Sequence, residues 1–223
     1  MTLQELINAV MLKATGKPTI LPESNAKWAK IRGIANYYQQ AWLNEPGIHW
    51  NSRYERARQI GTISANDEYE LDDDITEIST ARGDDVYVMT NDNKKVKFQM
   101  VDYDDLQNYP NGNYCAKLGN NLVFNSRFME DDPCYGGRLY APVYTTLEDL
   151  ESADDDVLVD DPTWLVTMSA AEYIRNDIVK QNQYGNLIAE ANNLMTSMIR
   201  NNRAGQVRHI RGGFRNGGGL NYD

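Results

Sequence analysis

Aspartate clusters are the residues of this 223-residue chain whose type and spacing could do chemistry. Neighbouring carboxylates can hold a divalent cation or act as an acid–base pair on a glycosidic bond. Neither Asp102 nor Asp154 begins a calcium-binding loop, because the glycine at position six and the glutamate at position twelve are missing. Adjacent aspartates on a strand or turn also point apart. We interpret the clusters as solvated loop charge. They are Asp72, Asp73 and Asp74; Asp84 and Asp85; Asp104 and Asp105; Asp131 and Asp132; Asp154, Asp155 and Asp156; and Asp160 and Asp161.

Histidine and cysteine are too scarce to build a conventional site. Cys115 and Cys134 are the only cysteines and form no CxxC pair, which excludes a disulfide scaffold and a thiolate zinc site and fits a reducing compartment. His49 and His209 cannot form a multi-histidine metal centre, and no GxSxG motif accompanies His49, which we expect to be a packed or capping residue beside Trp50. Phosphate-binding GxxxxGK[ST] and GxGxxG motifs are absent. We therefore expect no catalytic residue, no metal and no cofactor, and a protein that is not an enzyme.

Charge is strongly segregated along the chain. Residues 1–66 carry 8 Lys/Arg against 4 Asp/Glu, residues 67–161 carry 7 against 24, and residues 162–223 carry 7 against 4. The acidic middle argues against a simple nucleic-acid-binding protein, because it would repel phosphate. It also indicates that the middle of the chain is a separate module. No run approaches 18 apolar residues and Met1 to Glu5 lacks the basic start of a secretory signal, so we expect a soluble protein, made in the cytoplasm, without membrane contact.

Helical periodicity is confined to the two ends of the chain. Thr2 and Glu5 form a capping box before a first helix that stops at Gly16, and Ser24 can cap a second helix that ends before Pro46. After the acidic middle, Asp161 and Pro162 supply an N-cap and a first-turn proline. The apolar stripe that follows runs to about Asn202, with Gly185 as a bend or an interruption. Its members are Trp164, Leu165, Met168, Ala171, Ile174, Ile178, Leu187, Ile188, Ala191, Leu194, Met195 and Met198.

Short β-type segments fill the acidic middle. They alternate apolar and polar residues or form β-branched and aromatic runs, and turn residues separate them. This spacing is typical of an antiparallel sandwich or small barrel. The predicted segments are Tyr69 to Leu71, Val86 to Thr90, Val96 to Met100, Tyr114 to Leu118, Leu122 to Phe124 and Leu139 to Tyr144.

The predicted fold is α+β, with a helical bundle made from both ends of the chain. Residues 1–56 supply its N-terminal helices, residues 162–202 supply its C-terminal helices, and residues 57–161 form an inserted acidic β-module. Residues 203–223 form an extended arm, rich in glycine and arginine, that cannot bury enough surface to fold alone. We expect this arm to become ordered when it binds a partner, with its aromatic side chain anchored in the contact and its arginines bound to acidic groups. Its candidate assembly residues are Arg203, Arg208, Ile210, Arg211, Phe214 and Arg215.

Several motifs, taken in order, resemble the head-to-tail connector (adaptor) proteins of tailed bacteriophages. Each motif alone is weak, and the resemblance lies in their succession around a β-insert with a glycine and arginine tail. The motifs are Leu3 to Val10, Lys30 to Asn36 leading to Trp42, Thr62-Ile63, Tyr69 to Ile75, Asp161 to Val166, Ala170 to Tyr173, Asn176-Asp177 and Ala189 to Asn192.

The resemblance implies a structural virion protein in the neck between head and tail. Connectors of this family form a ring, usually of twelve copies, that docks under the portal protein and offers a platform for a tail or nozzle protein. The family has no fixed catalytic residues. A ring around duplex DNA must let the polyanion slide, which an acidic lumen allows because no phosphate contact releases counterions. We expect DNA to pass without specific binding. The candidate channel or rim residues are Asp72, Asp73, Asp74, Asp84, Asp85, Asp131, Asp132, Asp154, Asp155 and Asp156.

Two other classes of function stay open on the residues alone. One is a non-enzymatic binding module that uses the acidic β-insert to attract a basic partner. The other is a virion-associated hydrolase of cell-wall glycan, for which the sequence offers no identifiable acid pair. Self-association separates a connector from a binding module, and a turbidity assay on cell walls tests the hydrolase.

Overall fold

The computed structural model describes residues 1–80 and 82–211, with side chains described as far as Arg203. The chain is mixed α+β, as predicted, and divides into two compact units. The helical unit comprises residues 1–52 together with the chain from Leu147 onward, and the β-unit comprises Arg53–Thr146. The described segments on both sides of the β-unit therefore belong to one unit, while the β-unit is a continuous insertion.

Four α-helices form most of the helical unit, and their ends follow local capping chemistry. The predicted capping box is present: Glu5 N–H donates to Thr2 Oγ1 (3.3 Å) and Thr2 N–H donates to Glu5 Oε2 (3.0 Å). Asn25 rather than the predicted Ser24 caps the second helix, accepting from Lys27 N–H at 2.9 Å. Asp161 caps the next helix as expected. The helices are α1 (Leu3–Thr15), α2 (Ala26–Leu43), α4 (Pro162–Ile174) and α5 (Gln181–Arg211), with the short 3-10 turns η1 (Asn51–Arg53) and η2 (Ile178–Lys180).

The apolar stripe that follows Pro162 is divided between two helices, and the division comes earlier than the sequence suggested. α4 ends at Ile174, and Asp177 then caps η2 by accepting from Val179 N–H at 3.1 Å. Gly185, the predicted bend or interruption, lies inside α5. α5 also continues to Arg211 rather than ending at about Asn202, so the backbone of residues 203–211 is helical where an extended arm was predicted.

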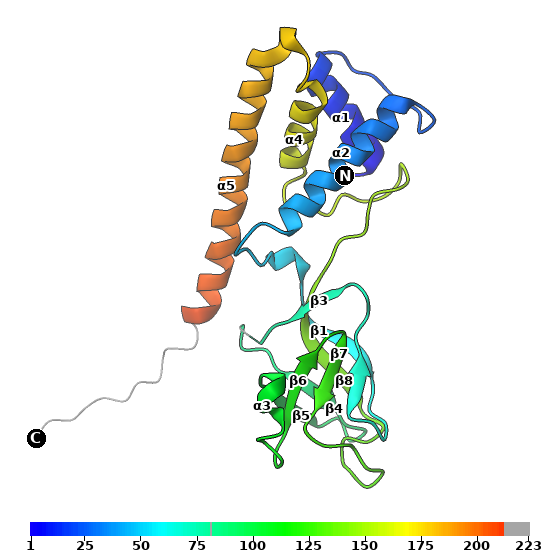
Figure 1. Ribbon diagram of the computed structural model, residues 1–223, viewed down its shortest axis with the longest axis vertical. Coiled ribbons are helices and arrows are strands. Elements are labelled where there is room, and N and C mark those ends of the chain that lie inside the picture. The colour runs from blue at the N-terminus through cyan, green and yellow to red at the C-terminus, as the bar shows by residue number, and fades with distance from the viewer. Residues whose placement is uncertain (81, 212–223) are drawn as a thin grey trace, which may run out of the picture. The chain divides into compact units, whose positions relative to one another are not determined.

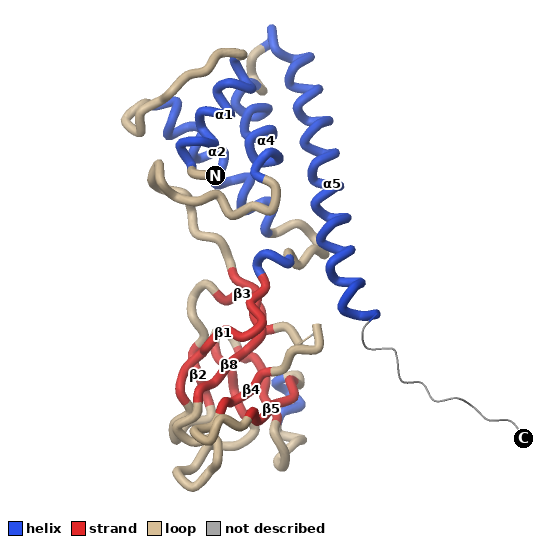
Figure 2. Tube along the Cα trace, turned by 180° about the vertical axis from the view of Figure 1, so that it is seen from behind, coloured by secondary structure: helices blue, strands red, loops and turns tan. Residues whose placement is uncertain are grey.

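α4 is the centre of the helical core. It lies between α5 on one side and α1 with α2 on the other in both views, and α5 continues past its end (Figures 1 and 2). Trp42 stacks on Trp50 with ring centroids 4.5 Å apart, and the Trp50 indole N–H donates to the Trp42 carbonyl oxygen (2.7 Å). The fully buried side chains of this core include Leu3, Leu6, Ile7, Val10, Ile31, Trp42 and Leu165.

Residues 147–161, predicted as part of the β-module, pack in the helical core instead. The buried residues of this segment are Leu147, Leu150, Val157 and Val159. The N–H groups of Leu3 and Gln4, which α1 cannot satisfy internally, donate to the carbonyl oxygens of Asp155 (2.8 Å) and Ala153 (3.0 Å). This irregular acidic segment therefore helps to cap α1, a role that its charge does not indicate.

The β-unit is one continuous sheet in the order β1-β8-β4-β5-β6-β7-β2, with β3 also paired to β8. Neighbouring strands are antiparallel except β5 and β6, which are parallel. The six predicted segments are strands, whereas the sequence analysis missed β1 and β3. The strands are β1 (Tyr54–Thr62), β2 (Glu68–Glu70), β3 (Ile75–Ile78), β4 (Val86–Met89), β5 (Lys95–Met100), β6 (Tyr114–Leu118), β7 (Asn121–Phe124) and β8 (Arg138–Thr145), and the short helix α3 (Tyr103–Leu106) follows β5.

The sheet curls around its own hydrophobic core (Figure 2). Phe98 makes edge-to-face contacts with Phe124 (centroids 4.8 Å apart) and Phe128 (6.0 Å), and Tyr69 of the end strand β2 contacts Phe124 at 5.6 Å. Gly137 allows a close approach, because a Cβ there would lie 2.7 Å from Val88 Cγ1. β1 and β2, at opposite ends of the strand order, form no ladder, so the curl is open.

Candidate functional site

The acidic triplet at Asp72 to Asp74 lies beside an arginine of β1. Arg58 Nη2 is 3.0 Å from Asp72 Oδ2 and 3.3 Å from Asp74 Oδ1, and Arg58 Nη1 is 3.3 Å from Glu55 Oε1. The hydrogen bond to Asp72 is the main cause that raises the pKa of Arg58. Asp73 is exposed. Two of the three predicted channel carboxylates here are therefore paired within the unit, which lowers the negative potential that the sequence implied.

The next pair of acids is also neutralised locally. Asp84 accepts from Arg56 Nε (2.6 Å) and from the Tyr54 hydroxyl (2.9 Å). Burial, followed by this bond to the carboxylate, raises the pKa of Tyr54, so the phenol stays protonated at neutral pH. Asp85 pairs with Lys97 at 2.6 Å. These carboxylates, which lie just before β4, connect the start of that strand to β1 and β5.

Asp131 and Asp132, the third cluster among the predicted channel residues, lie next to a buried thiol. Asp132 Oδ1 accepts from Cys134 N–H at 2.7 Å, while Asp131 is exposed. Burial, with a smaller contribution from Asp132, raises the pKa of Cys134 to about 11, and burial alone raises the pKa of Cys115 to about 12. Both thiols are therefore protonated near pH 7 and unsuited to act as nucleophiles.

The last cluster of predicted channel residues, Asp154 to Asp156, belongs to the helical unit. Asp155 Oδ2 accepts from the N–H groups of Glu151 (2.6 Å) and Ser152 (2.8 Å), and Asp155 Oδ1 accepts from Ser152 Oγ (2.7 Å). The hydrogen bonds from the Ser152 and Glu151 backbone lower the pKa of Asp155. Asp154 and Asp156 are exposed. The predicted channel residues are thus divided between the two units.

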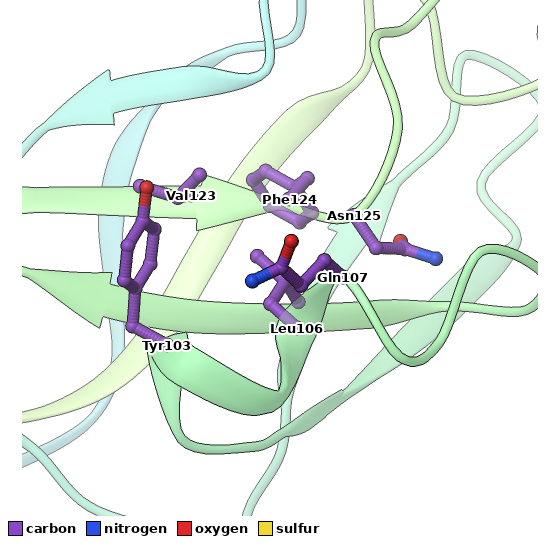
Figure 3. A pocket seen from close by; sticks show the side chains of 6 residues that line it. All are labelled: Tyr103, Leu106, Gln107, Val123, Phe124 and Asn125. Atoms are coloured by element: carbon purple, nitrogen blue, oxygen red, sulfur yellow. The ribbon is translucent and has the colours of Figure 1, made fainter.

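The described side chains can be compared with the needs of a metal site and of a ligand pocket. Within residues 1–80 and 82–203, no group of three or more His, Cys, Asp or Glu side chains is arranged to hold a metal ion. A shallow hollow of about 270 Å³ lies between α3 and β7 (Figure 3). Its lining includes no carboxylate, and Asn125 is engaged by donating to the Tyr109 (2.6 Å) and Gly112 (3.0 Å) carbonyl oxygens. The residues of this hollow are Tyr103, Leu106, Gln107, Val123, Phe124 and Asn125.

A polar anchor that the sequence did not indicate lies at the start of the predicted assembly arm. Asn202 of α5 is 5% exposed, and its Nδ2 donates to the His49 carbonyl oxygen (2.9 Å) while its Oδ1 accepts from Asn51 N–H (2.8 Å). Asn51 Nδ2 in turn donates to the Asn202 carbonyl oxygen at 2.9 Å. The anchor fixes α5 to the segment carrying the buried Trp50. An asparagine in a polar stretch of helix gives no sequence signal for such a role.

The arm therefore begins from a fixed position on the helical unit. Arg200 and Arg203 are exposed on either side of Asn202, and neither makes an ion pair with a described side chain. The side chains of Arg208, Ile210 and Arg211 are not among those described, although their backbone continues α5. Phe214 and Arg215 lie outside the described residues.

No described helix has the length and apolar character needed to cross a membrane. Comparison with known proteins supplies no relative: no protein-family model matches the chain, and no curated protein sequence matches it. Function has to be argued from the chain itself.

Proposed function

We propose that the chain is a structural virion protein, the head-to-tail connector that joins the DNA-filled head of a tailed bacteriophage to its tail. The observation that carries the proposal is the insertion of a β-unit between two terminal segments that share one hydrophobic core. This is the arrangement expected from the order of the motifs that resemble connectors. The finer description belongs to the same proposal: a bundle of terminal helices carrying a sandwich-like or barrel-like module and a C-terminal arm.

The proposed partners follow from this role. The chain would form a ring of its own copies, of about twelve as in the family it resembles, with the portal protein on one side and a tail or nozzle protein on the other. The exposed Arg200 and Arg203, next to the buried Asn202, support an arm that leaves the helical unit at a defined place to bind a partner. A catalytic role has no comparable support, because the described side chains present no acid pair that a reaction could be assigned to.

Passage of DNA through the ring is the second part of the proposal. Arg58, Arg56 and Lys97 form ion pairs with four of the seven aspartates of the β-unit that were predicted to line the channel. The repulsion of phosphate therefore depends on the remaining exposed carboxylates. We expect purified rings to show no retention of duplex DNA at moderate salt. Strong, salt-sensitive retention would contradict sliding passage. The exposed carboxylates among the predicted residues that make no described ion pair are Asp73, Asp131, Asp154 and Asp156.

A mass measurement tests the connector role directly. Native mass spectrometry of the purified chain, alone and mixed with the portal protein encoded by the same phage, should show a ring or a ring bound to the portal. Immunogold labelling should place the chain at the neck of the particle. A chain that stays monomeric with and without the portal, and is absent from the neck, would contradict the proposal and favour a binding module.

A further inference from the structure

One edge of β5 is hydrogen-bonded to a neighbouring strand over only part of its length. β5 pairs with β4 over Lys95–Phe98, and its pairing with β6 on the other side begins at Gln99. Thr90 N–H donates to the Lys94 carbonyl oxygen, and hydrogen-bonded positions alternate in an antiparallel ladder, so Val96 and Phe98 bond to β4. The backbone groups of Lys95 and Lys97 therefore point to the opposite edge, where no strand of the described chain pairs with them.

The space beside this edge is open. A hollow of about 520 Å³ lies where β5 and β6 diverge, bounded by Lys97 to Met100 on one side and by Gly112 to Tyr114 on the other. Thr80 and Asp85 also line it. An added strand would therefore find room next to Lys97.

β2 offers the matching edge at the end of the sheet. Phe124 N–H donates to the Asp67 carbonyl oxygen and Leu71 N–H donates to that of Asn120, so the alternation assigns the Tyr69 backbone to β7 as well. The backbone groups of Glu68 and Glu70 point away from β7, and β1 forms no ladder with them. The Tyr69 side chain is buried in the core, whereas Glu68 and Glu70 are exposed on the outer face.

The two edges are complementary in charge as well as in hydrogen bonding. Phe98 is buried in the core, so Lys95 and Lys97 lie on the outer face of the sheet, as Glu68 and Glu70 do. Contacts with β4 and with the residue before it hold both ammonium groups there, because Lys97 pairs with Asp85 and Lys95 Nζ lies 3.7 Å from the centre of the Tyr87 ring. Each edge thus presents two outward-bonding residues, two positions apart, with the same sign of charge.

We propose that β5 of one copy of the chain adds to β2 of the next copy, antiparallel, with Lys95 opposite Glu70 and Lys97 opposite Glu68. The inference rests on the proposed ring and names the contact that builds it. Pairing of β5 with β5 would place lysine opposite lysine, and pairing of β2 with β2 would place glutamate opposite glutamate. Only the unlike pairing is favourable. Because it uses different patches on the two copies, it is heterologous, which is the type of contact that the proposed ring requires.

A disulfide trap tests the register. Residues in a hydrogen-bonded antiparallel pair have Cα atoms about 5.5 Å apart, which suits a disulfide. The full chain carrying Lys97→Cys and Glu68→Cys should form a ladder of covalent multimers under mild oxidation, reversed by reductant. The native Cys115 and Cys134 are buried and should not contribute. A chain with Lys97→Cys and the exposed Glu130→Cys is the matched control and should form no ladder. A ladder in the control alone, or in neither chain, overturns the inference.

Charge reversal tests the energetics. We expect K95E/K97E and E68K/E70K each to raise the dissociation constant of self-association about tenfold, because attraction at two cross-strand pairs becomes repulsion. The chain carrying all four substitutions restores the unlike pairing and should return to the wild-type value. K17E/K27E, two reversals on exposed lysines of the helical unit, should change nothing. Sedimentation velocity measures association, and circular dichroism confirms that each variant is folded.

The outcomes separate this contact from the proposed function. Rings that form in the wild type but respond to neither reversal, or are not restored by the fourfold variant, overturn the strand contact and leave the connector role intact. A chain that cross-links in this register but is absent from the neck of particles supports the strand contact and removes the connector role.

Discussion

The helical unit and the β-unit are stabilised by different side chains. The helical core contains all four tryptophans of the chain, each less than 5% exposed, and its centre is a helix packed on three others. The β-unit contains no tryptophan, and its core is built on Phe98, Phe124 and Phe128 with both cysteines. The helices depend on caps and periodicity within short segments, whereas the curled sheet depends on contacts between strands far apart in the chain.

This division supplies two separate probes of stability. Tryptophan fluorescence reports on the helical unit, because Trp28, Trp42, Trp50 and Trp164 all belong to it. Thiol labelling reports on the β-unit, because Cys115 and Cys134 are buried there with raised pKa values. A substitution that destabilises one core should therefore change the signal from that unit more than the signal from the other unit.

Phe98→Ala should have the largest effect. It removes a ring that contacts both Phe124 and Phe128 and leaves a cavity in the core. Such a substitution lowers the free energy of unfolding by about 3–5 kcal/mol. We expect rapid labelling of Cys115 and Cys134 with a thiol reagent under conditions that leave the wild type protected. The tryptophan fluorescence transition in urea should change much less. Equal loss of both signals would show that the two units unfold together.

Leu165→Ala should destabilise the helical unit and leave the β-unit protected. Leu165 is fully buried on α4, the helix at the centre of the helical core, and a leucine-to-alanine change at such a site costs about 2–5 kcal/mol. The urea midpoint followed by tryptophan fluorescence should fall while the thiols stay protected. Leu158→Ala, at a half-exposed leucine of the same unit, is the control and should leave the midpoint nearly unchanged.

Asn202→Ala should have an intermediate and local effect. It removes the two hydrogen bonds that the Asn202 side chain makes with the His49 carbonyl oxygen and the Asn51 N–H, at a cost of about 1–3 kcal/mol. Hydrogen exchange should increase in residues 48–52 and in α5, with little change in the β-unit. The neighbouring exposed Asn201→Ala supplies the control. Unchanged exchange at 48–52 would show that the anchor is dispensable.

Asp155→Asn should give the smallest effect and one that depends on pH. The pKa of Asp155 is lowered in the folded chain by N–H donors from Ser152 and Glu151, so its ionised form stabilises the fold above the ordinary carboxyl pKa. That contribution is lost as the pH falls through the lowered value. The difference in urea midpoint between wild type and variant should be present at neutral pH and shrink in acid. Asp154→Asn, at an exposed site, should show no such trend.

The sequence predicted much of the local structure and little of the candidate site. The capping box at Thr2, the cap at Asp161 and six strands could be recognised because each depends on neighbouring residues. β1 was missed because its charged residues and its two irregularities in pairing with β8 obscure the alternation. The salt bridges of Arg58 join residues 14 and 16 positions apart in a sheet whose folding pattern no local signal specifies.

Composition and periodicity determined that the two ends are helical, that the middle is acidic and strand-forming, and that the chain is mixed α+β. Capping and amphipathicity act over three or four residues, so a linear pattern contains them. Only the tertiary structure decided that residues 147–161 pack with the helices, that Asp72, Asp74, Asp84 and Asp85 of the β-unit form ion pairs, and that Asn202 anchors α5. These features join residues that are distant in sequence. The role of such a residue depends on its burial and its hydrogen-bond partners, which the residue type alone does not reveal.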